Sequence, residues 1–362
     1  MERRPLKILQ LAKFYTPHRG GIETVVETLS KGLKERGLEV DLLCFASLGQ
    51  KTVRQFNVII CSIGANFFSQ PLSWSYIFYF LKNKKKYNLF HIHSPNLLAE
   101  FLASIFLWKK KYVVSFHSDV LGKGWLGKLS RVLTFYSLYR ANRIFVSSSE
   151  YIEGSPLLPF FRDKITVIPF GVFDFSKEKT TQSLELPTKF DLFVGRLVEY
   201  KGIGYLVSAI EKSQTNLVIV GVGPLEKVLK KAVEERKLTN KITFLGNLEH
   251  KSLIEVYKRA NSLILPSIDR RESFGVTLIE AMSFGVPIIT TKINTGVDMI
   301  SQDGYTGVVV PPKNSEELAR GILFLQNLDK RSQFSKNARK RYECFFTEKT
   351  MSKTYHYYLN KI

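Results

Sequence analysis

Cysteine is scarce in this sequence, and its scarcity excludes two classes of protein. Three cysteines occur among 362 residues, at Cys44, Cys61 and Cys344, and none forms a Cys-x-x-Cys pair. Disulfide frameworks and structural zinc sites require several cysteines at short, regular spacing. We therefore expect neither of them, and the scattered thiols suit a reducing cytoplasm.

Long hydrophobic runs are missing as well. The longest apolar stretches, residues 72–81 and 97–108, fall short of the roughly 20 residues that cross a bilayer, and the second contains Glu100. The first residues, MERRPLKILQLAKF, lead directly into a predicted strand without the apolar core or the cleavage site of a signal peptide. These absences predict a cytoplasmic protein without a transmembrane helix.

Two motifs of nucleotide-using enzymes are also absent. The sequence contains no Asp-x-Asp and no His/Asp cluster, so we expect no catalytic divalent metal and no other cofactor. No Gly-x-Gly-x-x-Gly follows a predicted strand, which argues against an NAD-dependent dehydrogenase.

Acidic residues are few relative to basic ones. The chain has 53 Lys and Arg against 32 Asp and Glu, a net charge of +21. Residues 1–180 hold 26 basic against 13 acidic residues, and residues 181–362 hold 27 against 19, so the excess is heavier in the first half. Such a balance favours nucleic acid, an acidic membrane surface or phosphorylated substrates, or simply solubility. Charge alone does not choose among these.

The sequence does contain a repeated alternation of strands and helices. Residues 6–14 predict a strand, 15–21 a turn and 22–36 an amphipathic helix, and further short apolar strands alternate with helices up to residue 171. The polar stretch 173–189 lacks any period and predicts a linker, after which the alternation restarts at residue 191. Near-continuous apolar strands between helices indicate parallel sheets that are covered on both faces.

We therefore predict an α/β protein with two Rossmann-like parallel-sheet lobes facing a central cleft. The expected domains are residues 1–175 and 188–345, with a C-terminal helix at about 346–362 packing back on the first lobe. Ligands of such folds bind at the carboxyl ends of the strands.

The stretch RRESFGVTLIEAMSFGVP, residues 270–287, is the most informative motif. It places Glu272 in a loop and Glu280 inside the helix that Gly275 starts. Free amides at a helix N-terminus bind phosphate, and ionised carboxylates accept hydrogen bonds from ribose and sugar hydroxyls. The alternative is a capping acid together with an acid paired to a lysine. Spacing alone leaves these two interpretations level.

This stretch resembles the Glu-x7-Glu signature of the family 4 retaining glycosyltransferases, which have the GT-B fold. The resemblance runs nearly end to end, through HRGGIE at 18–23, FHSD at 116–119, VIPFG at 167–171, FVGR to YKG at 193–202 and VGVGP at 220–224. It is strongest to bacterial O-antigen and surface-polysaccharide mannosyltransferases. Phe173 and the stretch 295–298 depart from the family pattern, which bears on the identity of the donor.

The resemblance implies a donor site in the second lobe. It gives Arg196 and Lys201 the donor diphosphate, where fixed cations stabilise the charge that the leaving nucleoside diphosphate gains. It gives Glu280 the ribose hydroxyls and Glu272 the sugar hydroxyls. The other implied donor-binding positions lie at strand ends and at the helix start, and they are Gly195, Gly221, Gly223, Phe274, Gly275 and Val276.

The resemblance also implies residues of the first lobe. Gly20 and Gly21 form a loop in which the backbone approaches the phosphates closely. His117 reaches the transferring sugar, and Asp119 orients it. His93 either lies near the acceptor or merely packs.

The implied activity is the metal-independent transfer of a hexose from a nucleotide-diphosphate sugar to a lipid-linked or polysaccharide glycan acceptor. GDP-mannose is the favoured donor, and UDP-glucose, UDP-galactose and UDP-N-acetylhexosamines remain open. No side chain is an evident nucleophile, so we expect front-face transfer within an ion pair. A sugar-nucleotide epimerase, which needs no acceptor, is the alternative enzyme. A nucleic-acid-binding module explains the charge but neither Glu272 nor Glu280, so we expect no nucleic-acid partner.

The basic excess gathers beside aromatic residues in the first lobe. Residues 72–164 hold 14 Lys and Arg against 5 Asp and Glu, in stretches such as LSWSYIFYFLKNKKK and LWKKKY. Apolar anchors beside basic clusters suit an amphipathic surface on anionic lipid. We therefore expect peripheral binding to the inner face of the cytoplasmic membrane, unless these aromatic residues simply cover the sheet.

Overall fold

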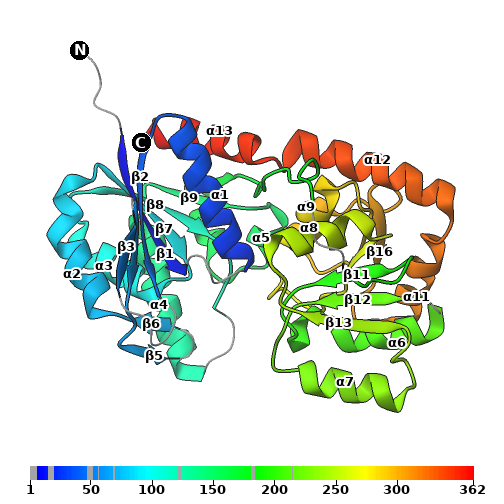
Figure 1. Ribbon diagram of the computed structural model, residues 1–362. Coiled ribbons are helices and arrows are strands. Elements are labelled where there is room, and N and C mark those ends of the chain that lie inside the picture. Colours follow the sequence, from blue (N-terminus) through cyan, green and yellow to red (C-terminus); the bar gives the residue numbers. More distant parts are fainter. Residues whose placement is uncertain are drawn as a thin grey trace. The chain divides into compact units, whose positions relative to one another are not determined.

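A computed structural model describes residues 6–14, 20–46, 52–55, 57–67, 70–120, 124–180, 184–213 and 215–362 of the protein. The chain forms two compact units, each with its own parallel sheet (Figure 1). Unit 1 consists of Met1–Gly171 together with Glu348–Ile362, and unit 2 of Val172–Thr347. The described part of the chain therefore has the two Rossmann-like sheets that the alternation of strands and helices predicts.

The sheet of unit 1 has the strand order β10-β9-β8-β7-β1-β2-β4-β3 among the described residues. Neighbouring strands are parallel except β3, which pairs antiparallel with β4, and β5 and β6 form a separate antiparallel pair. The order reverses between β1 and β7. The strands are β1 (Lys7–Phe14), β2 (Glu39–Phe45), β3 (Val53–Gln55), β4 (Val58–Cys61), β5 (Ala65–Phe67), β6 (Gln70–Leu72), β7 (Leu89–Ser94), β8 (Lys111–Phe116), β9 (Arg143–Val146) and β10 (Ile165–Val167).

Helices cover both faces of this sheet, with α2 and α3 on one face and α1 and α13 on the other (Figure 1). Central strands are buried on both faces, which explains why they read as continuous apolar runs. The helices are α1 (Gly21–Glu35), α2 (Trp74–Asn83), η1 (Lys84–Lys86), α3 (Leu97–Phe106), α4 (Gly124–Arg140), α5 (Glu150–Glu153), η2 (Leu158–Lys164) and α13 (Glu348–Leu359).

The C-terminal helix α13 belongs to unit 1 because it packs tightly against α1. A Cβ on Gly32 of α1 would lie 2.6 Å from the Cβ of Ser352, so the two helices approach at a glycine. The Arg36 guanidinium donates a 2.8 Å hydrogen bond to the Ser352 hydroxyl and another, of 2.9 Å, to the Lys349 carbonyl. Close backbone approach and these bonds fix the register of the two helices.

The sheet of unit 2 is parallel, with the order β13-β12-β11-β14-β15-β16 among the described residues. Strand order reverses between β11 and β14, and such a switch point is where ligands of open α/β sheets bind. The sequence pattern missed β16. The strands are β11 (Asp191–Val194), β12 (Leu217–Val220), β13 (Ile242–Gly246), β14 (Leu263–Leu265), β15 (Ile288–Thr291) and β16 (Gly307–Val310).

The helices of unit 2 connect and cover these strands. The predicted linker is also part of this unit, because the first half of the polar stretch 173–189 is fixed by polar contacts to α8 and α12. The helices are η3 (Glu199–Lys201), α6 (Ile203–Ser213), α7 (Glu226–Glu235), α8 (His250–Arg259), α9 (Val276–Ser283), α10 (Gly296–Ile300), α11 (Ser315–Phe324) and α12 (Leu328–Phe345).

Candidate active site

The loops that follow β11 and β14 meet at the switch point of unit 2. A Cβ on Gly202 would lie 2.0 Å from the carbonyl oxygen of Pro266, so only glycine permits this approach. The meeting of the loops brings together Lys201 and Glu272, 71 residues apart in the sequence, as an ion pair. The Ser267 hydroxyl donates a second hydrogen bond, of 3.0 Å, to Oε2 of Glu272.

This ion pair is almost completely shielded from solvent. The Lys201 side chain is 11% exposed and that of Glu272 is 10% exposed. Burial opposes the charged form of Lys201, but the adjacent Glu272 carboxylate outweighs it and raises the pKa of the lysine. The site therefore keeps a protonated ammonium group at the end of the sheet.

Glycines shape the backbone on the other side of Lys201. Gly221, after β12, has φ of +128°, and a Cβ there would lie 2.0 Å from the Gly195 carbonyl oxygen. A Cβ on Gly223 would lie 2.4 Å from the Leu197 carbonyl oxygen, and a Cβ on Gly195 would lie 3.6 Å from Nζ of Lys201. Gly195, Gly221 and Gly223 therefore hold the turns after β11 and β12 against each other and beside Lys201.

Helix α9 places Glu280 slightly more than one turn beyond its start. Gly275 is the N-cap residue with φ of +83° and ψ of +58°, a left-handed conformation that favours glycine. Phe274 is buried next to it, and Val276 begins the helix. The sequence prediction that Gly275 starts this helix agrees with the structure.

Glu280 has a partner that the sequence analysis missed. The buried hydroxyl of Tyr257, on α8, donates a 2.8 Å hydrogen bond to Oε2 of Glu280. The Tyr257 ring also stacks on Phe284, with centroids 5.4 Å apart. Burial and the Glu280 carboxylate keep the pKa of this hydroxyl well above its usual range, so it stays a donor. No local signal in residues 250–259 points to Glu280; the only cue is that a buried tyrosine hydroxyl needs a partner.

The stretch 295–298, which departs from the family pattern, has a structural role. Thr295 and Asp298 form a capping box at the start of α10, and the Gly296 amide donates a 2.9 Å bond to the Ser273 carbonyl. A Cβ on Gly296 would lie 2.5 Å from the Phe274 ring. These residues therefore support the loop that carries Glu272.

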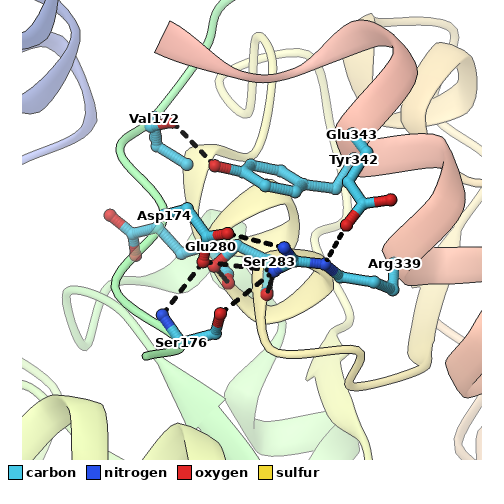
Figure 2. Close-up of polar contacts among 8 residues, drawn as sticks. All are labelled: Val172, Asp174, Ser176, Glu280, Ser283, Arg339, Tyr342 and Glu343. Carbon is cyan, nitrogen blue, oxygen red and sulfur yellow. Dashed lines mark hydrogen bonds and ion pairs between the residues drawn. The ribbon is translucent and has the colours of Figure 1, made fainter. Parts of the chain in front are cut away.

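A second network anchors the other end of α9 (Figure 2). Arg339 of α12 forms a 2.6 Å ion pair with Asp174 and donates to the carbonyl of Ser283, the last residue of α9. Burial raises the pKa of Asp174, but the hydrogen bond from Arg339 outweighs it and lowers the value to about 2. The Tyr342 hydroxyl donates a 2.9 Å bond to the Val172 carbonyl. The helix that carries Glu280 is thus held at both ends.

Arg196 is not bonded to the Lys201–Glu272 pair. Its side chain is exposed, and within the described part of the chain its guanidinium makes no hydrogen bond or ion pair. The structure brings Lys201 together with Glu272 but does not tie Arg196 to either of them. Its role toward the diphosphate stays a prediction.

In unit 1, two predicted residues meet at the carboxyl ends of β7 and β8. Nδ1 of His93 and Nε2 of His117 are 3.0 Å apart, and the two rings stack with centroids 5.2 Å apart. Phe170 packs on the other side of His117, with ring centroids also 5.2 Å apart. Burial lowers the pKa of His117 to about 3, so this imidazole is neutral at physiological pH.

Among the described residues, the Asp119 carboxylate is hydrogen-bonded to Ser155, and its role toward His117 stays a prediction. Asp119 accepts a 2.7 Å hydrogen bond from the Ser155 hydroxyl, and its amide donates to the Tyr151 hydroxyl. His93 is the hydrogen-bond partner of His117. After His117, the chain thus places Asp119 beside Ser155 and beside Tyr151 of α5.

Gly20 and Gly21 lie at the start of α1 in unit 1. Gly20 is the N-cap residue, and Gly21 is the first residue of this 15-residue helix. Both are exposed, and His18 and Arg19 of the same motif lie outside the described residues.

Within the ranges that the structure describes, no group of three or more His, Cys, Asp or Glu side chains is placed to hold a metal ion. The expectation that catalysis needs no metal stays a prediction.

Comparisons with known proteins agree with this geometry. Residues 19–173 match the model of Glycosyltransferase Family 4, and residues 175–341 match that of Glycosyl transferases group 1. O-antigen chain mannosyltransferase C of Escherichia coli is 31% identical over 360 residues, which cover 97% of each chain. D-rhamnosyltransferase WbpZ of Pseudomonas aeruginosa is 29% identical over 353 residues, covering 94% of this chain and 92% of the relative.

Solved structures show the same fold. Anabaena Alr3699/HepE in complex with UDP and glucose matches with a TM-score of 0.79 at 19% identity, over 99% of this chain and 100% of that one. Sequence relationship, fold and switch-point geometry lead to one conclusion. The protein belongs to family 4 of the glycosyltransferases and is a glycosyltransferase of GT-B fold.

Proposed function

We propose that this protein is a retaining transferase that moves a hexose, with GDP-mannose as the first-choice donor, to a growing surface-polysaccharide glycan. The observation that carries the proposal is the buried Lys201–Glu272 pair at the switch point of unit 2. A buried ion pair is seldom a gain for stability, because desolvation offsets the attraction between the charges. A nucleotide-sugar donor explains both Lys201 and Glu272, because its diphosphate needs a cation and its hydroxyls need a hydrogen-bond acceptor.

The physical chemistry of the site fits this donor. Sugar transfer leaves extra negative charge on the nucleoside diphosphate, and the protonated Lys201 is fixed and shielded from water, where it stabilises that charge most strongly. The Glu272 carboxylate accepts hydrogen bonds from sugar hydroxyls, and Glu280, oriented by Tyr257, accepts those of the ribose. We propose that these groups act without a bound metal.

Retention of anomeric configuration is part of the proposal. The neutral imidazole of His117 suits hydrogen bonding to a sugar hydroxyl. We propose transfer on the front face of the sugar within a short-lived ion pair. The one-bond carbon–proton coupling at the anomeric carbon of the product distinguishes retention from inversion, and an inverted product would contradict this mechanism.

The donor is proposed from the relatives. Mannose is the first choice because the mannosyltransferase of Escherichia coli is 31% identical to this chain, whereas the similar solved structure binds UDP and glucose. Thermal-shift titration of the wild type with GDP and with UDP separates the two. A ligand at about 100 times its dissociation constant stabilises by about 2.7 kcal/mol, so the true nucleotide gives a clear shift. A larger shift with UDP than with GDP would refute the choice of GDP-mannose.

We further propose that unit 1 rests on anionic lipid, near a lipid-linked acceptor. Trp74, Phe78 and Leu81 follow the spacing of one helix face, and they are exposed on α2, Trp74 by 83%. On the opposite face, Tyr76 and Phe80 are buried in the core of unit 1. The outward aromatic residues are therefore not needed to cover the core.

Cations lie over other exposed rings of unit 1. Lys84 is 4.7 Å from the ring centroid of Phe106, and Arg140 is 4.1 Å from that of Trp108, which is 68% exposed. Aromatic rings with nearby cations suit the boundary between headgroups and acyl chains, and each cation there contributes about 1 kcal/mol. None of the described helices is long and apolar enough to cross a membrane, so the proposal is surface attachment.

Vesicle flotation with an anionic phospholipid bilayer at physiological salt tests this attachment. Charge reversal to Glu at six sites should release the protein while leaving transfer to a short soluble acceptor intact; the sites are Lys84, Lys85, Lys86, Lys109, Lys110 and Lys111. A matched control reverses six exposed lysines of unit 2, namely Lys177, Lys179, Lys189, Lys227, Lys237 and Lys251. Equal release by both variants would show only a response to net charge, and no binding by the wild type would refute attachment.

A further inference from the structure

The hydrogen bond between His93 and His117 has an unusual property, because both partners are neutral imidazoles. Burial lowers the pKa of His93 well below its usual range and that of His117 to about 3. A neutral imidazole has one N–H and one bare nitrogen. The 3.0 Å contact between Nδ1 of His93 and Nε2 of His117 therefore contains one proton, which comes from one ring or from the other.

The other two ring nitrogens follow from this proton. If His117 donates through Nε2, its Nδ1 is bare and accepts, while Nε2 of His93 carries a proton. If His93 donates through Nδ1, then Nδ1 of His117 carries a proton and Nε2 of His93 is bare. The two outer nitrogens thus always have opposite hydrogen-bonding character. Fixing the tautomer of His93 fixes that of His117.

Both outer nitrogens are buried, and neither has a partner among the described residues. Within that part of the chain, Nδ1 of His117 and Nε2 of His93 make no hydrogen bond. A buried polar atom without a partner is costly, so its presence indicates a ligand or water that completes it. A hydroxyl both donates and accepts, so a sugar hydroxyl suits either form of Nδ1 of His117.

We propose that His93 is a positioning residue that selects the tautomer of His117 and so decides whether Nδ1 of His117 donates to the substrate or accepts from it. The proposal rests on the proposed role of His117 toward a sugar hydroxyl. His93 thus takes the orienting role that the sequence suggested for Asp119, which the structure pairs with Ser155.

The neighbouring His91 offers a matched control. Its ring lies 4.3 Å from that of His93 and is equally buried, but its Nε2 bonds the Ser115 hydroxyl at 2.7 Å. Ser115 is in turn 2.9 Å from the Tyr355 hydroxyl of α13. His91 therefore contributes to the same stack of rings without hydrogen bonding to His117.

The first measurement uses the wild type and needs no variant. In uniformly 15N-labelled protein at neutral pH, we expect a through-hydrogen-bond nitrogen–nitrogen coupling between Nδ1 of His93 and Nε2 of His117. We also expect the two ring nitrogens of His117 to have widely separated shifts, as a single neutral tautomer requires. Absence of the coupling together with averaged His117 shifts would overturn the proposal, whether or not the protein is active.

Three variants then test the consequence for catalysis. His93→Phe keeps a ring in the stack but removes the bond, so the His117 shifts should move toward each other and kcat should fall at least tenfold, with KM for the donor changing less than twofold. His93→Asn places an amide where Nδ1 was, which still pairs with Nε2 of His117 through its oxygen or its NH2 group, and it should keep the hydrogen bond and most of the activity. His91→Phe should leave the His117 shifts unchanged.

Two results would contradict the assignment. If His93→Phe or, should that variant not fold, His93→Leu leaves the His117 shifts of the wild type in place, His93 does not select the tautomer. If His91→Phe averages the His117 shifts as strongly as His93→Phe does, the effect comes from packing. Tautomer shifts that respond as expected in a protein without transferase activity would instead refute the proposed function and leave the hydrogen-bond coupling standing.

Discussion

Replacement of the Lys201–Glu272 pair, one partner at a time and then together, separates its structural role from its catalytic one. Lys201→Met leaves the Glu272 carboxylate buried beside an apolar chain. Removing one partner of a buried pair costs about 3–5 kcal/mol, because the remaining charge is uncompensated. The Ser267 hydroxyl still donates to Glu272, so we expect the lower end of this range.

The double variant Lys201→Met/Glu272→Gln removes both charges while keeping an acceptor for the Ser267 hydroxyl. Replacing a buried ion pair by neutral groups of similar size is often neutral for stability. We therefore expect the double variant to recover most of the free energy of unfolding that Lys201→Met loses. Activity should not recover, because a preorganised charge-stabilising group is worth roughly a hundredfold to a thousandfold in rate.

The assay combines urea denaturation, followed by circular dichroism, with kcat/KM for transfer from the nucleotide sugar. If the pair is merely an acid paired with a lysine, the alternative that the sequence leaves open, stability and activity should recover together in the double variant. A double variant that is both stable and active at the wild-type level would therefore refute the reasoning.

The remaining predictions concern the residues around the pair and the reaction conditions. Tyr257→Phe should weaken nucleoside diphosphate binding by about tenfold in isothermal titration, since a hydrogen bond to a charged group contributes about 1.5–3 kcal/mol. The control Tyr342→Phe should show no such loss, because the Tyr342 hydroxyl bonds a backbone carbonyl. Activity should survive EDTA, and loss that magnesium or manganese reverses would contradict metal independence. The pKa of Asp174 is about 2 in the folded protein, below its ordinary value of 3.8. Its pairing with Arg339 therefore stabilises unit 2 above pH 4, and this stabilisation is lost as the pH falls from about 4 to about 2. Acid titration of Asp174→Asn should lack this loss, and an unchanged acid limb would show that the pair contributes nothing.

The buried histidines of unit 1 were predicted only in part. The resemblance implies His93 and His117 as residues of the site, and parallel strands bring their carboxyl ends to one edge. The register between β7 and β8 determines that the two histidines meet. Ser94 lies opposite Phe116, and this pairing places the rings of His93 and His117 in contact. Strand register depends on the whole sheet, so the local motif FHSD suggested Asp119 as the partner instead.

In unit 2, too, the local sequence pattern predicts part of the candidate site, and tertiary contacts determine the other part. The spacing of Glu272 and Glu280 around Gly275 predicts the loop and helix, because glycine at a left-handed position starts α9. Two partners come from elements that the spacing does not include, namely Lys201 after β11 and Tyr257 on α8. Those contacts arise from the reversal of strand order, which no local stretch of sequence encodes.

The polar stretch 173–189 shows how a predicted linker becomes part of a unit. Its described residues, 173–180 and 184–189, form neither a helix nor a strand, as the lack of period predicts. The structure nevertheless fixes its first half through side chains such as Asp174, which needs Arg339 from α12 as its partner. A partner 165 residues away in the sequence gives no local signal.

A crystal structure of the wild type with bound GDP tests the central claim most directly, because it locates the donor site without relying on activity. The account predicts the diphosphate within hydrogen-bonding distance of Nζ of Lys201 and the ribose hydroxyls on the Glu280 carboxylate, with Tyr257 still bonded to Oε2. A nucleotide bound elsewhere, with the Lys201–Glu272 pair intact and remote from it, would contradict the account.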